Sequence, residues 1–293
     1  MSIPKPSAAN RAAARTIESA VGEGVRSLIG YSGSPQLDAE VLLSTALGVD
    51  RSALIARGSE TLAEQDLRVY RDLLEELRRG MPVAYLTGRR EFWSLPLKVT
   101  SAVLVPRPET EVLVEVALEH IPKSEERAVL DLGTGSGAVA LAIASERPLA
   151  RVIGVDVSSG ALGVARDNAR SLGLANVTFR LGSWFDAVPG ETFDVVVANP
   201  PYVADHDPAL AELSAEPALA LAAGPAGLDA LEAIVAQAPP HLTRGGWLLL
   251  EHGSTQEHAV ATLLERRGFA GIACRSDYSG LPRITRGSYS PHL

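Results

Sequence analysis

Residues 131–137 read Asp-Leu-Gly-Thr-Gly-Ser-Gly, directly after the apolar run Ala-Val-Leu at 128–130 and directly before a helical stretch from Ala138. Three glycines at alternate positions let the backbone turn tightly and approach a ligand closely. The amino end of the helix points its free N–H groups at whatever binds there. The stretch therefore predicts a strand, a ligand-binding loop and a helix in immediate succession.

The glycine spacing limits the ligand of this loop. A dinucleotide fingerprint, G-x-G-x-x-G, counted from Gly133 would place Gly at 138, although that pattern also permits the Ala found there. A P-loop is excluded because no Lys-Ser or Lys-Thr follows the glycines. A purely structural tight turn is the alternative interpretation.

Asp156 ends the second predicted strand, in Gly154-Val155-Asp156. A carboxylate at this place can accept hydrogen bonds from both hydroxyls of a ribose, a feature shared by NAD and S-adenosylmethionine sites. The alternative is a cap for the helix that begins near Ser158. Together, the loop and Asp156 predict an adenosine ligand and leave its identity open.

From Ala128 onward, short apolar runs alternate with helical stretches. This alternation predicts βαβ units, a parallel sheet, and ligand chemistry at the carboxyl ends of the strands. The last part, 271–289, has no long helix, and we expect it to add two antiparallel strands at one edge. The predicted strands before it are 128–132, 152–155, 177–181, 193–198 and 246–251.

The segment 10–80 has a helical pattern instead. A cap at Ser34-Pro35 and a stop at Gly48 bound one predicted helix. Thr61 and Glu64 predict a capping box for the next. The apolar face of that second helix is predicted to be Leu67, Tyr70, Leu74 and Leu77.

Between Arg89 and Val105 the apolar residues recur at every second position, which predicts a β-hairpin. A helix is predicted over 109–121. The predicted fold class is α/β. Its predicted domains are a helical bundle at 1–85, a β-hairpin linker at 86–106 and a Rossmann-like sheet domain at 107–293.

The composition excludes several classes of function. The chain has 293 residues, of which 46% are hydrophobic, and a formal net charge of −8, which is typical of a globular protein with a buried core. Its only cysteine, Cys274, excludes an internal disulfide and cysteine-rich zinc sites, and the six histidines lack metal-ligand spacing. Residues 1–80, with 10 basic against 11 acidic side chains, offer no basic face for nucleic acid.

The sequence also indicates a location. No stretch approaches the roughly 18 uninterrupted apolar residues of a spanning helix, and residues 1–20 lack the apolar core of a secretory signal. We therefore expect a cytoplasmic protein with no membrane partner. Residues 1–17 contain bases and no acid before Glu18, as organellar import signals do; a short flexible extension is the preferred interpretation.

The predicted strand 193–198 ends in Asn199-Pro200-Pro201-Tyr202. The Asn side-chain oxygen and the Pro200 carbonyl are two acceptors side by side, which suit the two hydrogens of an NH2 group. The prolines stiffen the loop, and the ring of Tyr202 offers a flat face for a planar amide or base. A plain turn after the strand is the alternative.

These features resemble the S-adenosylmethionine-dependent methyltransferases that act on planar NH2 nitrogens, which have a seven-stranded sheet with one antiparallel edge strand. Further motifs at 82–88, 91–93, 106–111 and 250–253 are similar to the release factor glutamine N5-methyltransferases. The chain differs from that family at Ser183, where Asp is common before Trp-Phe, and in the segment 208–216, which is shorter and lacks an Arg.

The resemblance implies S-adenosylmethionine as cofactor and class I peptide chain release factors as partners, with the helical domain helping to dock them. The methyl acceptor would be the side-chain amide of Gln in their Gly-Gly-Gln motif. The implied catalytic residues are Asn199, Pro200 and Tyr202, and Pro201 joins them in substrate binding. The implied cofactor-binding residues are Asp131, Gly133, Thr134, Gly135, Ser136, Gly137, Asp156, Trp184 and Asn199.

Two other functions stay open on the sequence. Amino methyltransferases of adenine or guanine share Asn-Pro-Pro-Tyr, but they would need a basic substrate domain. A non-catalytic S-adenosylmethionine-binding adaptor would tolerate substitution in the acceptor loop. The acids between Asp205 and Glu265 outnumber the single base Arg244, which favours a protein partner over a phosphate backbone.

Overall fold

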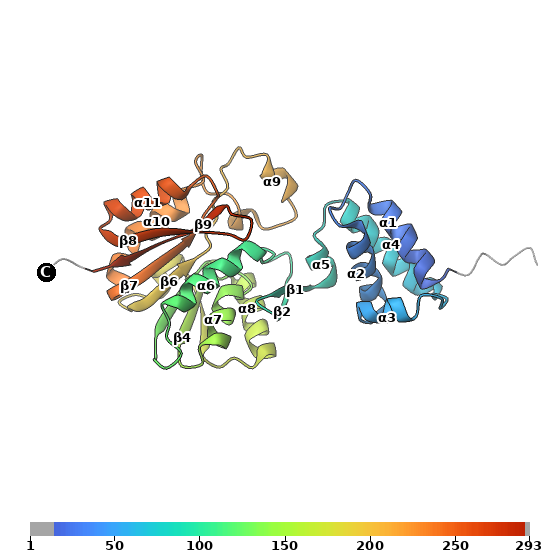
Figure 1. The fold of residues 1–293 in the computed structure, drawn as a ribbon, viewed down its shortest axis with the longest axis horizontal. Helices are drawn as coiled ribbons and strands as arrows, with labels where there is room; N and C mark the ends of the chain where they lie inside the picture. The colour runs from blue at the N-terminus through green and yellow to red at the C-terminus, as the bar shows by residue number, and fades with distance from the viewer. Residues whose placement is uncertain (1–14, 291–293) are drawn as a thin grey trace, which may run out of the picture. The chain divides into compact units, whose positions relative to one another are not determined.

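The computed structural model describes residues 15–290, and the chain divides into two compact units, residues 1–87 and 88–293 (Figure 1). The interpretation of residues 1–17 as an import signal falls, for residues 1–14, outside the described part. Within residues 15–290, no helix is both long and apolar enough to cross a membrane.

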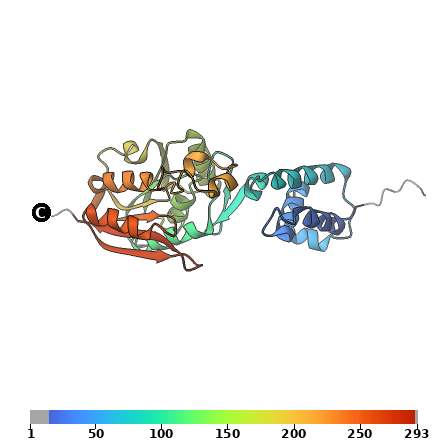
Figure 2. The ribbon, with the colours of Figure 1, turned by 90° about the horizontal axis from the view of Figure 1, so that it is seen from above.

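The first unit is a bundle of helices, coloured blue to teal in Figure 2. As predicted, α2 starts at Pro35 and stops before Gly48, whose left-handed φ of +63° and backbone N–H close the last turn, but the side chain of Ser34 makes no capping hydrogen bond. The predicted face of α4 is buried. The described helices of this unit are α1 (Ile17–Leu28), α2 (Pro35–Leu47), α3 (Arg51–Ala56), α4 (Glu64–Arg78) and α5 (Val83–Thr87).

The predicted capping box of α4 is wrong. The helix begins at Glu64 after Ala63, and no side chain caps it. Thr61 instead forms an isolated antiparallel bridge with Thr16, and the N–H of Leu62 donates to the carbonyl of Arg15. Residues 61 and 62 are therefore extended, since their backbone groups pair with the chain before α1.

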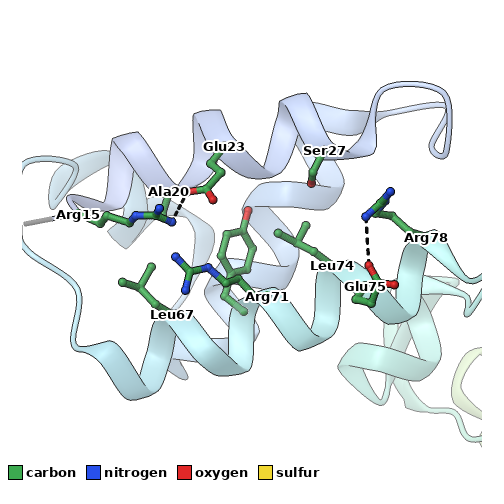
Figure 3. Close-up of a pocket in the computed structure, with 10 residues that line it drawn as sticks. Arg15, Ala20, Glu23, Ser27, Leu67, Arg71, Leu74, Glu75 and Arg78 are labelled. Atoms are coloured by element: carbon green, nitrogen blue, oxygen red, sulfur yellow. Dashed lines mark hydrogen bonds and ion pairs between the residues drawn. The ribbon is translucent and has the colours of Figure 1, made fainter. Parts of the chain in front are cut away.

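A cavity of about 210 Å³ lies between α1 and α4 (Figure 3). Tyr70 lines it from α4 and is 2% exposed, yet its hydroxyl has no hydrogen-bond partner. This hydroxyl occupies the space where a side chain at Gly24 would begin, because a Cβ there would lie 1.9 Å from it. Gly24 thus allows α1 and α4 to approach closely.

The second unit opens with the predicted hairpin, β1 (Arg89–Phe92) paired antiparallel with β2 (Leu95–Lys98). Its turn residues Trp93 and Ser94 both have positive φ, as a two-residue hairpin with matched twist requires. The expected β-structure does not continue to Val105, because residues 99–105 lie outside any strand.

A seven-stranded sheet forms the centre of this unit, in the order β5-β4-β3-β6-β7-β9-β8. Apolar side chains pack α6 and α7 on one face and α10 and α11 on the other. The strands are β3 (Ala128–Leu132), β4 (Arg151–Asp156), β5 (Val177–Leu181), β6 (Phe193–Ala198), β7 (Leu242–Glu251), β8 (Phe269–Ser276) and β9 (Pro282–Tyr289). The helices and 3-10 turns are η2 (Pro108–Thr110), α6 (Glu111–Glu119), α7 (Ala138–Glu146), α8 (Ser159–Leu172), η3 (Trp184–Ala187), α9 (Ala209–Glu212), η4 (Ala218–Ala220), α10 (Asp229–Gln237), η5 (Pro239–His241) and α11 (Glu257–Arg266).

The expected parallel strands are confirmed, and so are the two strands at one edge that pair antiparallel, β8 and β9. The single antiparallel edge strand that the resemblance implied has a different position. Only β9 runs against the other strands, and it lies between β7 and β8 rather than at the edge. The crossover through α11 places β8 one strand beyond β7, and the short connection after β8 returns β9 into the gap between them. β9 thereby pairs with a strand on each side.

The strand order reverses direction at β3, which lies between β4 and β6. In sheets of this kind, a crevice opens outside the carboxyl ends of the strands where the order reverses. The register pairs Leu132 with Val155 on one side and with Ala198 on the other. The residues that follow these three therefore meet at one edge of the sheet, and they include Gly133, Asp156 and Asn199.

Candidate active site

The loop between β3 and α7 is held against the end of β4. The N–H groups of Gly133 and Thr134 donate to the carbonyl of Val155 at 2.8 and 2.9 Å. Gly133 and Gly135 have φ of +71° and +56°, a left-handed conformation that other residues rarely adopt. The glycines are therefore required by the turn itself, which brings the loop backbone to the ligand-binding edge of the sheet.

The Asp131 side chain forms hydrogen bonds with this loop and with α7. Its Oδ2 accepts hydrogen bonds from the Thr134 hydroxyl at 2.7 Å and from the Ala140 N–H at 3.2 Å. Burial raises the pKa of Asp131 to about 6, although these two hydrogen bonds lower it. The nearby charge of Asp156 raises the pKa further. The Asp131 carboxyl thus joins the end of β3 to both the loop and the first turn of α7.

Asp156 uses both carboxylate oxygens. Its Oδ2 accepts from the Gly135 N–H at 2.9 Å, and its Oδ1 accepts from the Ser158 N–H at 2.8 Å. The cap of α8 is Ser158, whose hydroxyl accepts from the Ala161 N–H at 3.1 Å. A carboxylate offers about four acceptor positions, so about two remain for the two hydroxyls of a ribose.

Two predicted cofactor-binding residues have other surroundings. Gly137 does not line the cavity at this edge; a Cβ there would lie 3.0 Å from Leu141 and 3.3 Å from Ala165. Ser136 is 3% exposed, and its carbonyl accepts from the side chain of Asn168 at 2.9 Å. The last glycine of the loop therefore allows α7 and α8 to pack closely, whereas the first two line the cavity.

Trp184 follows β5 and lines the same cavity beside Ser183. Its φ of +45° is rare for a residue with a side chain, and such strain persists where surrounding structure imposes it. A Cβ on Gly133 would lie 3.6 Å from the Trp184 ring. The ring is thus placed next to the glycine loop, where a planar base of an adenosine ligand would lie.

Asn199 is half-buried at the end of β6 and lines the cavity together with Pro201. Its Nδ2 donates to the Thr110 hydroxyl oxygen at 3.1 Å. This contact uses one N–H of the amide, fixes which end of the side chain is the donor, and leaves Oδ1 as an acceptor for a ligand. Pro200 is buried behind these residues, and the Tyr202 hydroxyl lies 3.5 Å from Oε1 of Glu251.

The cavity has a volume of about 400 Å³, and the segments 102–107 and 217–222 complete its wall. Glu216 joins them: its side chain is 3% exposed, its Oε2 accepts from the Val105 N–H at 2.9 Å, and its Oε1 pairs with Arg107. Within residues 15–290, no group of three or more His, Cys, Asp or Glu is arranged to hold a metal ion.

Three further polar residues of this region were not predicted as site residues: Thr110 and Glu251, which lie in the motifs 106–111 and 250–253, and Glu216, which ends the segment 208–216. The position of Glu251 at the end of β7 could have placed it in the site, because the carboxyl ends of neighbouring parallel strands meet at one edge of the sheet. Thr110 and Glu216 lie in non-strand segments 89 and 111 residues from their partners Asn199 and Val105, and no local pattern connects them.

Comparisons with known proteins cover both units. Residues 20–88 match the family described as PrmC N-terminal domain, and residues 123–263 match the family described as Methyltransferase domain. The chain is 50% identical over 254 residues to the release factor glutamine methyltransferase of Xylella fastidiosa (strain Temecula1), covering 86% of this chain and 92% of that protein. It is 42% identical over 260 residues to the enzyme of the same description from Escherichia coli (strain K12), covering 88% and 94%.

Among solved structures, a methyltransferase from Pyrococcus furiosus is similar in fold, with a TM-score of 0.51 and 17% identity over 67% of this chain and 90% of that one. A 16S rRNA methyltransferase of T. thermophilus, solved with AdoMet and guanosine, has a TM-score of 0.52 and 21% identity over 68% and 49%. At these identities the similarity shows the fold alone.

Proposed function

The chain belongs to the release factor glutamine methyltransferase family, and we propose that Asn199 and Pro200 hold the glutamine amide that receives the methyl group. The enzyme is an S-adenosylmethionine-dependent protein methyltransferase acting on the glutamine of peptide chain release factors. We further propose that this glutamine lies in their Gly-Gly-Gln motif, and that the reaction takes place in the cytoplasm, where these factors act.

The residues around the cavity fit S-adenosylmethionine. Two acceptor positions of Asp156 suit the ribose hydroxyls, the glycine turn at 133–135 allows close approach, and the Trp184 ring offers a face for adenine. When bound, S-adenosylmethionine supplies an electrophilic methyl group on sulfur. The work left to the protein is to bring the acceptor nitrogen to that methyl group in the correct orientation.

A carboxamide nitrogen is a poor nucleophile because its lone pair is delocalised into the carbonyl group. Fixing its orientation can lower the barrier by several kcal/mol, up to about 7–11 in ideal cases. Oδ1 of Asn199 and the carbonyl of Pro200 would each accept one N–H of the substrate amide. These N–H bonds become more polar as the nitrogen turns tetrahedral, so both acceptors stabilise the transition state more than the ground state.

The observation that carries this assignment is the contact of the Asn199 Nδ2 with Thr110. It fixes which end of the side-chain amide is the donor, so that Oδ1 lies on the opposite side and can accept an N–H of the substrate NH2 group. The methylated nitrogen is acidic enough to lose its proton to water, so the account requires no general base.

One assay separates this function from the two alternatives. Labelled S-adenosylmethionine is offered with a release factor, with the same factor carrying Gln→Ala in its Gly-Gly-Gln motif, with ribosomal RNA, and with DNA. We expect label on the intact factor alone, located by mass spectrometry. Label on RNA or DNA but not on the factor would contradict the proposal, and binding without transfer would support the adaptor.

The helical domain, residues 1–85, is proposed to dock the release factor. This role follows from the family to which the chain belongs, and residues 20–88 carry that family's amino-terminal domain. A photoreactive group at the exposed Arg71 position of full-length enzyme should crosslink to the factor. Absence of crosslinks from several exposed positions on this domain, with turnover intact, would argue against docking there.

A further inference from the structure

Glu251 is the last residue of β7, and Asn199 directly follows β6 beside it. The register pairs Ala198 with Leu250, so the next residue of each strand lies at the same edge of the sheet. Glu251 is 1% exposed. A carboxyl group that is almost completely removed from water, next to the proposed acceptor site, needs a reason to be there.

Two hydroxyl groups approach this carboxyl. The Tyr202 hydroxyl lies 3.5 Å from Oε1. Burial raises the pKa of Glu251 to about 7, while the neighbouring Thr110 and Tyr202 hydroxyls and the charge of Arg283 lower it and the charge of Glu109 raises it. The Oε2 atom is buried without a hydrogen-bond partner.

Among residues 15–290, no Lys, Arg or His forms an ion pair with Glu251. Arg283, from β9, is paired with Asp277 at 3.0 Å. The fold itself does not require an acid at this position, because the backbone of residue 251 already pairs with Ile284 in the sheet. An apolar or amide side chain of similar volume would avoid the cost of burying a charge.

The two hydroxyls lead to two of the predicted substrate-binding residues, Asn199 and Tyr202. Tyr202 contributes its own ring. Thr110 accepts from the Nδ2 of Asn199, and a hydroxyl has a single proton, which is then free to be donated elsewhere. An ionised carboxylate only accepts, so a neighbouring carboxylate forces the Thr110 proton toward itself and keeps the Thr110 oxygen available to Asn199.

We propose that Glu251 is a positioning residue for methyl transfer: its carboxylate holds the Thr110 and Tyr202 hydroxyls, and through Thr110 it keeps Oδ1 of Asn199 turned toward the substrate amide. A donor at position 251 would allow the Thr110 proton to turn toward the Asn199 oxygen. Nδ2 would then face the substrate NH2, donor against donor. This inference rests on the proposed function, since the amide in question is the proposed contact of the glutamine.

The test compares Glu251→Gln with Glu119→Gln, the same substitution at the far end of α6, where the carboxylate is exposed and pairs with Arg275 and Arg286. We expect Glu251→Gln to lower kcat by about 10–100-fold, with the affinity for S-adenosylmethionine unchanged, and Glu119→Gln to have no effect on either. Turnover equal in the two variants would overturn the proposal.

A cycle with Thr110 tests the route of the effect. Thr110→Val should lower kcat by a similar factor, and the double variant Thr110→Val with Glu251→Gln should be no slower than Thr110→Val alone. If the two single losses in kcat multiply in the double variant, Glu251 acts independently of Thr110. If Glu251→Gln does not fold, Thr110→Ser, which keeps the hydroxyl, should be slowed by less than about threefold, and equal losses in Ser and Val would overturn the proposal.

Two readouts separate this inference from simple stabilisation and from the proposed function. The kcat of the wild type should rise as pH increases through about 7, when Glu251 ionises among Arg283, Glu109 and Tyr202, and this step should vanish in Glu251→Gln. In the ligand-free enzyme, the Asn199 side-chain amide signals in ¹⁵N NMR should shift in Glu251→Gln and not in Glu119→Gln. Unchanged signals would overturn the inference, whether or not any release factor is methylated.

Discussion

Each of the two units contains a buried side-chain oxygen without a hydrogen-bond partner, on Tyr70 in one and on Glu251 in the other, and the surroundings of these two atoms differ. In the helical bundle, the Tyr70 hydroxyl lies against Gly24, and four of the five charged groups around its cavity form ion pairs with one another, Arg15 with Glu23 and Arg78 with Glu75 (Figure 3).

At the sheet edge, the Glu251 carboxyl lies next to hydroxyls that lead to Asn199 and Tyr202. The same cost of burying a polar atom is therefore a packing compromise in one unit and a positioning device in the other. The two oxygens differ in their neighbours: those of Glu251 connect it to the cavity-facing side chain of Asn199, and those of Tyr70 do not connect it to such a residue. Substitutions at Glu251 and at Tyr70 should therefore have different effects.

The largest effect is expected for Asn199→Ala. Removing the amide oxygen deletes one of two acceptors that strengthen in the transition state, which should lower kcat by about 10²–10³-fold. Calorimetry should show affinity for S-adenosylmethionine within a few-fold of wild type. Near-normal turnover would remove Asn199 from the reaction.

The pH dependence of the free energy of unfolding should distinguish the Glu251 carboxyl from the Tyr70 hydroxyl. The folded-state pKa of Glu251, about 7, lies above its ordinary value of 4.5. Its contribution to stability is therefore complete below pH 4.5 and is lost as pH rises through 7, a change on the order of 3 kcal/mol. Denaturant unfolding should show this loss in the wild type and less of it in Glu251→Gln. Identical pH profiles would contradict the assignment.

Asp156→Asn should weaken S-adenosylmethionine binding by about 10–100-fold, since hydrogen bonds to a charged acceptor contribute about 1.5–3 kcal/mol. The Gly135 N–H would also lose a charged partner. Asp167→Asn, on the exposed side of α8 where the acid pairs with Lys98, is the matched control and should bind normally. Equal affinities in titration calorimetry would leave Asp156 as a purely structural residue.

In the bundle, Gly24→Ala should destabilise the enzyme by about 1–3 kcal/mol, because the new Cβ would lie 1.9 Å from the Tyr70 hydroxyl and one of the two helices must shift. Combining it with Tyr70→Phe should recover part of the loss. The midpoint temperature of thermal unfolding measures this effect, and the affinity for S-adenosylmethionine should not change. An unchanged transition would show that the helices can separate at no cost.

The smallest effect is expected for Tyr70→Phe alone. It removes a buried hydroxyl without a partner and should raise stability by up to about 1 kcal/mol. Methyl transfer should stay as in the wild type, in contrast to Glu251→Gln. A loss of stability would mean that the hydroxyl is satisfied in solution, and the contrast between the two units would weaken.

Much of the catalytic unit follows from local patterns. The glycine turn at 133–135, the acid at the end of β4 and the acceptor after β6 were all predicted, because each is encoded within a few residues of one strand end. The capping box at Thr61 failed for the opposite reason: its outcome depended on a backbone bridge to Thr16, 45 residues earlier in the numbering. Equally, no local pattern shows that Ser136 and Gly137 face other helices rather than the cavity.

By itself, the sequence determined the α/β class, the strand positions and the residue types at the carboxyl ends, since hydrophobic period and glycine conformation act over short distances. Tertiary structure alone decided which of these ends become neighbours. Placing β7 beside β6 brings Glu251 next to Asn199, and the packing of η2 against that edge brings Thr110 to the Asn199 amide. The direction of a hydrogen bond depends on which donors and acceptors are buried together, and only the assembled sheet determines that.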